Sequence, residues 1–96
     1  MIEIRASKVL FYSQIDEDNF VAWIKSIASI KESYGDVEDI VLVFKDPFIP
    51  DFDLRELMSL YSRYDICMKD LKLFLNDENS HWFLDKKMYW FSRIFN

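Results

Sequence analysis

The sequence predicts an α+β fold, with a small, mostly antiparallel sheet and one helix in the N-terminal half and helices in the C-terminal half. Three observations predict it. The segment Ile40–Phe44 is apolar and rich in β-branched residues, as expected of a central strand covered on both faces. Two further segments, near residues 16–27 and 51–61, repeat apolar side chains at helical spacing. The 96 residues contain no repeat or linker, so we expect a single domain over residues 1–96.

The N-terminal half is interpreted as strand, helix and strand. Residues 2–13 alternate apolar and polar side chains and then run through four apolar residues, which predicts extended chain. Asp16, Glu17 and Asp18 suit the start of a helix, and an apolar stripe follows them: Phe20, Trp23, Ile24 and Ile27. This helix either fades near Ala28 and gives way to a strand through residues 30–32, or continues to Gly35, a natural residue after a helix end. We favour the shorter helix.

The middle of the chain continues from the central strand into a loop and a second helix. Two prolines within residues 45–51 remove backbone donors and predict the loop. Asp51 or Asp53 is expected to cap the next helix. The buried stripe of that helix is predicted to consist of Leu54, Leu57, Met58 and Tyr61.

The sequence of the last third of the chain does not decide between helix and strand. Residues 68–76 fit either, and their leucine, lysine and methionine content favours a helix. Residues 76–80 form a polar turn. Residues 81–95 fit a helix with two adjoining stripes, or a β-hairpin that turns at residues 85–87. The first stripe is Leu84, Met88, Phe91 and Phe95, and the second is Phe83, Trp90 and Ile94.

The composition argues against the common classes of catalytic, cofactor-binding and metal-binding site. One glycine is too few for a phosphate-binding loop or a dinucleotide fingerprint, and one cysteine excludes a disulfide framework or a cysteine-rich zinc site. Cys67 and His81 share no local catalytic signature, and the acidic clusters lack the ligand ladder of a calcium loop. We therefore expect no enzyme activity, no cofactor and no metal.

Charge is concentrated in one part of the chain. The net charge is −5, and residues 14–56 carry eleven acids against four bases, for −7. This balance opposes direct nucleic-acid binding and favours a basic partner. The longest apolar run is five residues, and the N-terminus resembles no signal peptide, so we expect a cytoplasmic protein without a membrane segment.

The acidic middle also contains apolar residues that suit a docking surface. Phe48 and Ile49 lie between two prolines, where a rigid loop would present them to a partner. Acids on either side would attract the partner's cations. The candidate partner-binding residues are Asp36, Glu38, Asp39, Asp46, Phe48, Ile49, Asp51 and Asp53.

The C-terminal half resembles small immunity proteins of bacterial contact-dependent growth inhibition systems. The resemblance covers residues 52–96. It rests on Leu54-x2-Leu57-x2-Leu60-Tyr61-x-Arg63-Tyr64-Asp65-Ile66-x-Met68-x2-Leu71-x2-Phe74, then Asn79-x2-Trp82-Phe83, Tyr89-Trp90 and Ile94-Phe95. It implies a non-enzymatic cytoplasmic protein that binds and blocks the toxin domain of a cognate effector, often a nuclease.

Two functions follow as expectations. The first is an immunity protein or antitoxin that occludes the active or substrate-binding site of a basic toxin, with a nuclease as the expected toxin. The alternative is an acidic nucleic-acid mimic, or a phage-type inhibitor of a host defence enzyme, which would imitate the spacing of phosphates.

Overall fold

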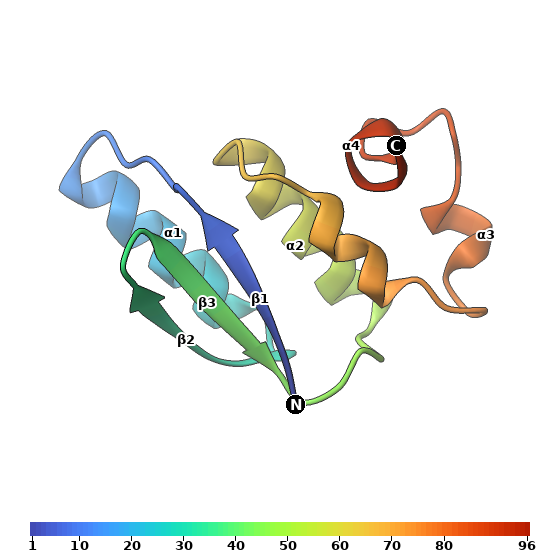
Figure 1. Ribbon diagram of the computed structural model, residues 1–96, viewed down its shortest axis with the longest axis horizontal. Coiled ribbons are helices and arrows are strands. Elements are labelled where there is room, and N and C mark those ends of the chain that lie inside the picture. The colour runs from blue at the N-terminus through green and yellow to red at the C-terminus, as the bar shows by residue number, and fades with distance from the viewer.

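The computed structural model describes all 96 residues and confirms the α+β class (Figure 1). A three-stranded sheet and two long helices form the main body, and shorter helical segments follow. The strands are β1 (Ile2–Ser7), β2 (Ile30–Asp36) and β3 (Asp39–Phe44). The helices are α1 (Gln14–Ser26), α2 (Asp51–Arg63), the 3₁₀ segment η1 (Lys69–Phe74), α3 (Ser80–Phe83) and α4 (Phe91–Phe95).

The last strand in sequence lies in the centre of the sheet. The strand order is β1-β3-β2, and β3 pairs antiparallel with both neighbours. Strands β1 and β2 are therefore parallel to each other, and α1 connects them. The predicted central strand is confirmed, because Val41, Leu42, Val43 and Phe44 are all buried.

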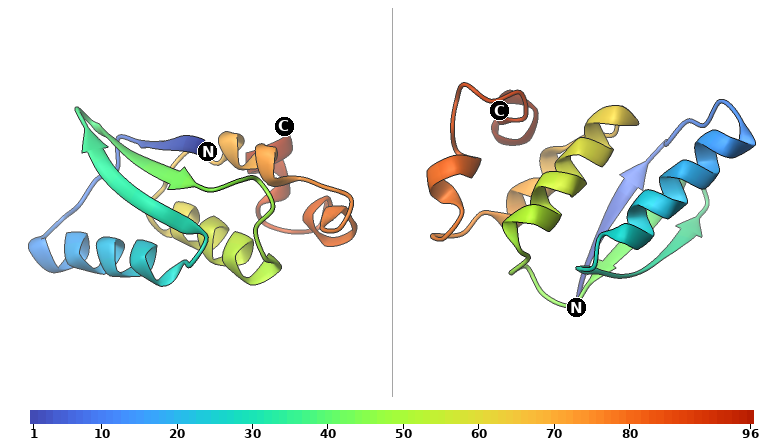
Figure 2. Two further views of the ribbon diagram at one scale, coloured as in Figure 1. Left: turned by 90° about the horizontal axis from the view of Figure 1, so that it is seen from below. Right: turned by 180° about the vertical axis from the view of Figure 1, so that it is seen from behind.

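The two faces of β3 are covered in different ways. Helices α1 and α2 lie under one face, where Leu42 and Phe44 join the main core (Figure 2). No helix lies over the other face. There Val41 is buried at a position flanked by Arg5 of β1 and Tyr34 of β2, whose long side chains border it. The sequence predicted cover on both faces, and the neighbouring strands supply the second cover.

Helix α1 matches the shorter of the two predicted helices. The Ser13 side chain accepts a hydrogen bond from the backbone N–H of Asp16 at 3.1 Å and caps the helix. The helix ends at Ser26, and β2 begins at Ile30. Gly35 therefore lies inside a strand rather than after a helix.

Helix α2 has the predicted stripe but not the predicted cap. Leu54, Leu57, Met58 and Tyr61 are fully buried, as expected. Pro50 precedes the helix, and no side chain caps its first turn. Proline is well placed at this boundary because the helix start needs no N–H from it. The carboxylate of Asp53 accepts hydrogen bonds from Ser29 instead of capping the helix.

The tail is less regular than either predicted alternative. The predicted helix at residues 68–76 is the 3₁₀ segment η1, and residues 81–95 form two short helices rather than one helix or a hairpin. The second stripe, Phe83, Trp90 and Ile94, is buried, whereas Leu84 and Met88 of the first stripe are exposed. The indole N–H of Trp90 donates to the carbonyl of Phe83 at 2.9 Å, which folds the chain back and prevents one continuous helix.

The hydroxyl of Tyr61 gives a stability prediction. This side chain is fully buried, its hydroxyl has no hydrogen-bond partner, and burial raises the pKa of Tyr61 above its ordinary value. Tyr61→Phe removes a desolvated polar group and should increase the free energy of unfolding by about 1 kcal/mol at pH 7.

The same substitution should change the pH dependence of stability. The wild-type protein should lose stability as pH rises above about 10, because the unfolded tyrosine ionises first while the folded state retains its proton. Tyr61→Phe should weaken that loss. Urea unfolding at pH 7 and pH 10.5 measures both effects, and a less stable variant at pH 7 would mean that the hydroxyl is satisfied.

Candidate protein-binding surface

The predicted partner-binding residues do not form one surface. Asp36, Glu38 and Asp39 lie at the turn between β2 and β3, whereas residues 46–51 follow the opposite end of β3 (Figure 1). A six-residue strand spans about 20 Å at its ordinary rise per residue. The two groups are adjacent in sequence but lie at opposite ends of the sheet.

The loop after β3 is less acidic than its sequence suggests. Phe48 is exposed, and its backbone N–H donates to the Asp46 carboxylate at 2.9 Å, which forms a tight local turn. Ile49 is half-buried against the core. Lys31 and Lys45 line the same shallow depression as Phe48, so positive charge offsets Asp46 and Asp51 at this end.

Asp53 has a role inside the fold. Its side chain is 7% exposed, and its carboxylate accepts hydrogen bonds from both the backbone N–H and the hydroxyl of Ser29. These bonds join α2 to the connection between α1 and β2. A carboxylate held in this way is not available to a partner, so Asp53 does not belong to the candidate surface.

The structure gathers acids at the end of the sheet that holds the β2–β3 turn. We call this region the acidic end. It comprises the second half of β1, the connection from β1 to α1, the first turns of α1, the β2–β3 turn with the adjoining strand ends, and the end of α2. Its acids are Asp16, Glu17, Asp18, Asp36, Glu38, Asp39 and Asp65, and its bases are Arg5, Lys8 and Arg63, for a net charge of −4 out of −5 for the chain.

Ion pairs within the acidic end leave some of its acids free. Arg5 contacts Asp36 at 2.7 Å and Asp39 at 3.3 Å, and these contacts raise the pKa of Arg5, chiefly through the hydrogen bond that Arg5 donates to Asp36. Glu17 and Glu38 are exposed and make no side-chain hydrogen bond within the protein. Like Asp65, which is also exposed and makes no side-chain hydrogen bond, they are available to a partner.

Large apolar side chains are exposed among these acids. Leu10, Tyr12, Ile15 and Val37 have exposed fractions of 61%, 86%, 71% and 100%. Val37 also has a φ of 59° in the two-residue turn, a backbone conformation that β-branched residues rarely adopt. Strained and exposed apolar residues of this kind concentrate at functional sites. Val37 was not among the partner-binding residues predicted from the sequence, although a lone valine among the acids of Asp-Val-Glu-Asp is a signal that could have identified it.

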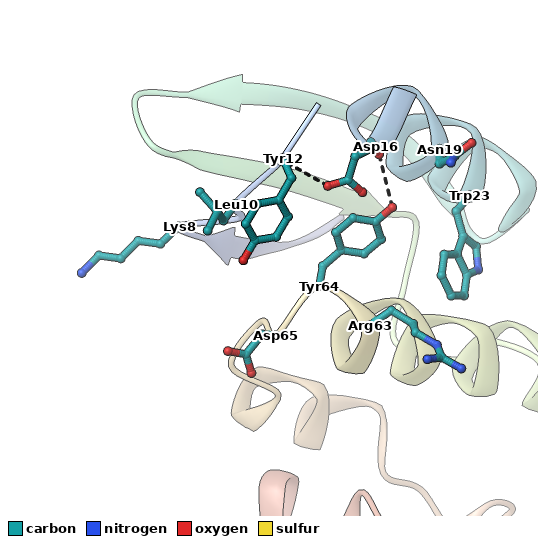
Figure 3. Close-up of a pocket in the computed structure, with 9 residues that line it drawn as sticks. All are labelled: Lys8, Leu10, Tyr12, Asp16, Asn19, Trp23, Arg63, Tyr64 and Asp65. Atoms are coloured by element: carbon teal, nitrogen blue, oxygen red, sulfur yellow. Dashed lines mark hydrogen bonds between the residues drawn. The ribbon is translucent and has the colours of Figure 1, made fainter. Parts of the chain in front are cut away.

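A groove runs between the β1–α1 connection and the end of α2 (Figure 3). Its volume is about 660 Å³, and aromatic rings share its lining with two acids, Asp16 and Asp65, and two bases, Lys8 and Arg63. The Asp16 carboxylate accepts the backbone N–H of Tyr12 at 3.0 Å, and the Tyr64 hydroxyl donates to the Asp16 carbonyl at 3.3 Å. Asp65 lies at the rim with a φ of 55°.

Tyr64 fixes the floor of this groove. Its ring packs edge-to-face on Phe20, with centroids 4.8 Å apart, and it also contacts Phe11 and Trp23. Burial, with a smaller contribution from the negative charge of Asp16, raises the pKa of Tyr64. The groove is therefore held by a packed aromatic cluster that joins α1 to α2.

No protein-family model, curated protein or solved structure matches the chain. No helix is both long enough and apolar enough to cross a membrane, and no three side chains of the histidine, cysteine or acidic type lie together as a metal site would need. The acidic end is the surface where a net negative charge, several exposed apolar side chains and a groove coincide.

Proposed function

We propose that this protein is a cytoplasmic binding protein of the immunity or antitoxin type, which blocks a basic partner protein through its acidic end and catalyses no reaction itself. One observation carries the proposal. The acidic end holds −4 of the net charge together with four exposed apolar residues: Leu10, Tyr12, Ile15 and Val37.

The two kinds of side chain would have separate roles in binding. The acids accelerate encounter with a basic surface and disfavour acidic competitors. Exposed apolar side chains such as Tyr12 supply the buried anchors that acids alone lack. Binding should therefore weaken as salt rises, yet persist in part at high salt.

A toxin that acts on nucleic acid is the partner class that these properties fit best. Its active site must bind a phosphate backbone and therefore carries positive charge. An acidic protein seated on that site excludes the substrate. The resemblance of residues 52–96 to immunity proteins of contact-dependent growth inhibition agrees with this class of partner, and those residues include the end of α2 beside the groove.

A nucleic-acid mimic uses negative charge differently. It imitates phosphates with rows of acids and needs no apolar anchor at its centre. The apolar residues of the acidic end favour a single protein partner over such a mimic. Breadth of inhibition separates the two functions, because a mimic should inhibit unrelated DNA-binding enzymes and an immunity protein should inhibit one.

Co-expression with the protein encoded by the adjacent gene tests the proposal. We expect the two proteins to co-purify, and we expect cells that carry both to survive expression of a neighbour that is toxic alone. If the neighbour is toxic but neither binds nor is neutralised, the proposed function is wrong. An inactive variant of this protein, with both Glu17 and Glu38 reversed to lysine, provides the control for protection.

A further inference from the structure

The outer side of β2 is an unpaired edge of the sheet. Strand order places β1 and β2 at the two edges, and the β1 edge is flanked by η1, with Glu3 and Leu73 lining the space between them. Nothing lies alongside β2 (Figure 1). Its residues Lys31–Gly35 are all exposed. We call the free side of this strand the open edge.

The register identifies the backbone groups that the open edge presents. The pair Asp36–Asp39 closes the two-residue turn, and bonded and non-bonded pairs alternate along an antiparallel ladder from that point. Tyr34 is paired with Val41 and directs its N–H and C=O towards β3. Ser33 and Gly35 therefore direct theirs outwards, where they can bond with another strand.

Residues 33–35 of β2 lack the devices that usually protect a sheet edge. Proteins block edges with proline, charged side chains or bulges. Here a register shift and Lys31 guard the start of the strand, and the charged residues Glu32 and Asp36 flank residues 33–35 without interrupting them. The two outward-bonding residues are a serine and a glycine, and a β-carbon added to Gly35 would meet nothing within 4 Å. An incoming strand would find space there.

The surroundings of the open edge define the side chains that an incoming strand should carry. Val21 lies on the inner side, the face of the sheet that α1 covers, and is 41% exposed. It is about 160° around the axis of α1 from Trp23. The indole N–H of Trp23 donates to the carboxylate of Glu56 in α2, so Trp23 marks the side of α1 that faces α2. Val21 thus points away from α2, towards the side of the open edge. On the outer side lie Glu32, Tyr34 and Asp36.

We propose that β2 pairs with an extended segment of the basic partner, in which lysine or arginine alternates with apolar side chains. The basic residues would lie beside Glu32 and Asp36, and the apolar residues would lie over Val21. Backbone bonds from Ser33 and Gly35 would fix the register. This inference rests on the proposed function, because it takes the partner to be basic. In an antiparallel pair of two copies of this strand, Glu32 and Asp36 would meet like charges, which disfavours pairing with a second copy of this chain.

The test uses the variants Ser33→Pro and Ser33→Ala with one peptide probe. The probe is an acetylated and amidated hexapeptide in which lysine alternates with valine. Proline at residue 33 removes an outward N–H and leaves the bonds to β3 intact, whereas alanine keeps that N–H. We expect chemical-shift changes at the Ser33 and Gly35 amides of the wild-type protein. We expect affinity about tenfold lower for Ser33→Pro and unchanged for Ser33→Ala.

A modified peptide keeps the test independent of the variants. The same hexapeptide, N-methylated at its valines, retains charge and apolar area but loses the backbone donors, and it should not bind the wild-type protein. Equal binding of the methylated peptide, or of Ser33→Pro, would overturn pairing at the open edge. Co-purification with the adjacent protein that is unaffected by Ser33→Pro would also overturn it, while the proposed function would stand.

Discussion

Asn79→Ala is expected to lower the free energy of unfolding by about 3 kcal/mol, because it leaves a buried backbone carbonyl and a half-buried backbone N–H without partners. Asn79 is 2% exposed. Its side-chain N–H donates to the carbonyl of Phe74 at 2.8 Å, and its side-chain oxygen accepts the N–H of Asn76 at 2.9 Å. These bonds connect the end of η1 to the start of α3.

The C-terminal third depends on such bonds because its regular structure is short. Segments η1, α3 and α4 have six, four and five residues, too few to be stable by helical bonds alone. Loss of the Asn79 bonds should therefore loosen the packing of Phe74 and Phe83 as well. The expected result is a lower unfolding midpoint with part of the loss confined to this third of the chain.

Urea unfolding followed by tryptophan fluorescence measures this effect, since Trp82 and Trp90 lie in the C-terminal third. Asn76→Ala is the matched control. Its side chain accepts the backbone N–H groups of Glu78 and Asn79 in a less buried turn, so we expect a cost of about 1 kcal/mol. Equal losses for the two variants would show that the buried bonds of Asn79 contribute nothing special.

The central strand and the long helices were predictable because their apolar patterns are distinct. Helix α1 follows from the spacing of Phe20 and Ile24, and β3 follows from its unbroken apolar run, whereas β2 extends to Asp36, beyond the expected residues 30–32. The tail was not predictable in the same way. Its two apolar stripes are equally good by spacing, and the choice between them depends on a tertiary bond from Trp90 to the Phe83 carbonyl. A turn at Asp85, whose carboxylate accepts the Lys87 N–H, adds to the break.

The candidate surface depends on strand order, which the sequence pattern does not specify. Insertion of β3 between β1 and β2 brings the start of α1 beside the β2–β3 turn, so Glu17 and Glu38 share one end of the molecule. The same extended β3 separates Glu38 from Phe48. Adjacency in sequence was therefore misleading where a strand intervenes, and the fold brings together two acids that are 21 residues apart.

The double charge reversal Glu17→Lys with Glu38→Lys is expected to weaken binding to the basic partner on the order of 100-fold at low salt. Both side chains are exposed and make no hydrogen bonds within the protein, so their replacement should leave the fold intact. The reversal changes the net charge from −5 to −1. It therefore turns the net −4 of the acidic end to zero.

The double variant Asp77→Lys with Glu78→Lys provides the matched control. It makes the same change in total charge, but both residues are exposed in the turn between η1 and α3, away from the acidic end. Affinity measured by calorimetry against the co-purified partner, at two salt concentrations, compares the variants. We expect the control to lose no more than a few-fold, because charges farther apart than about 10 Å are largely screened at 0.1 M salt. If both variants weaken binding equally, attraction depends on total charge alone. The acidic end would then have no special role, whereas a selective loss requires that the partner contacts the surface that holds Glu17 and Glu38.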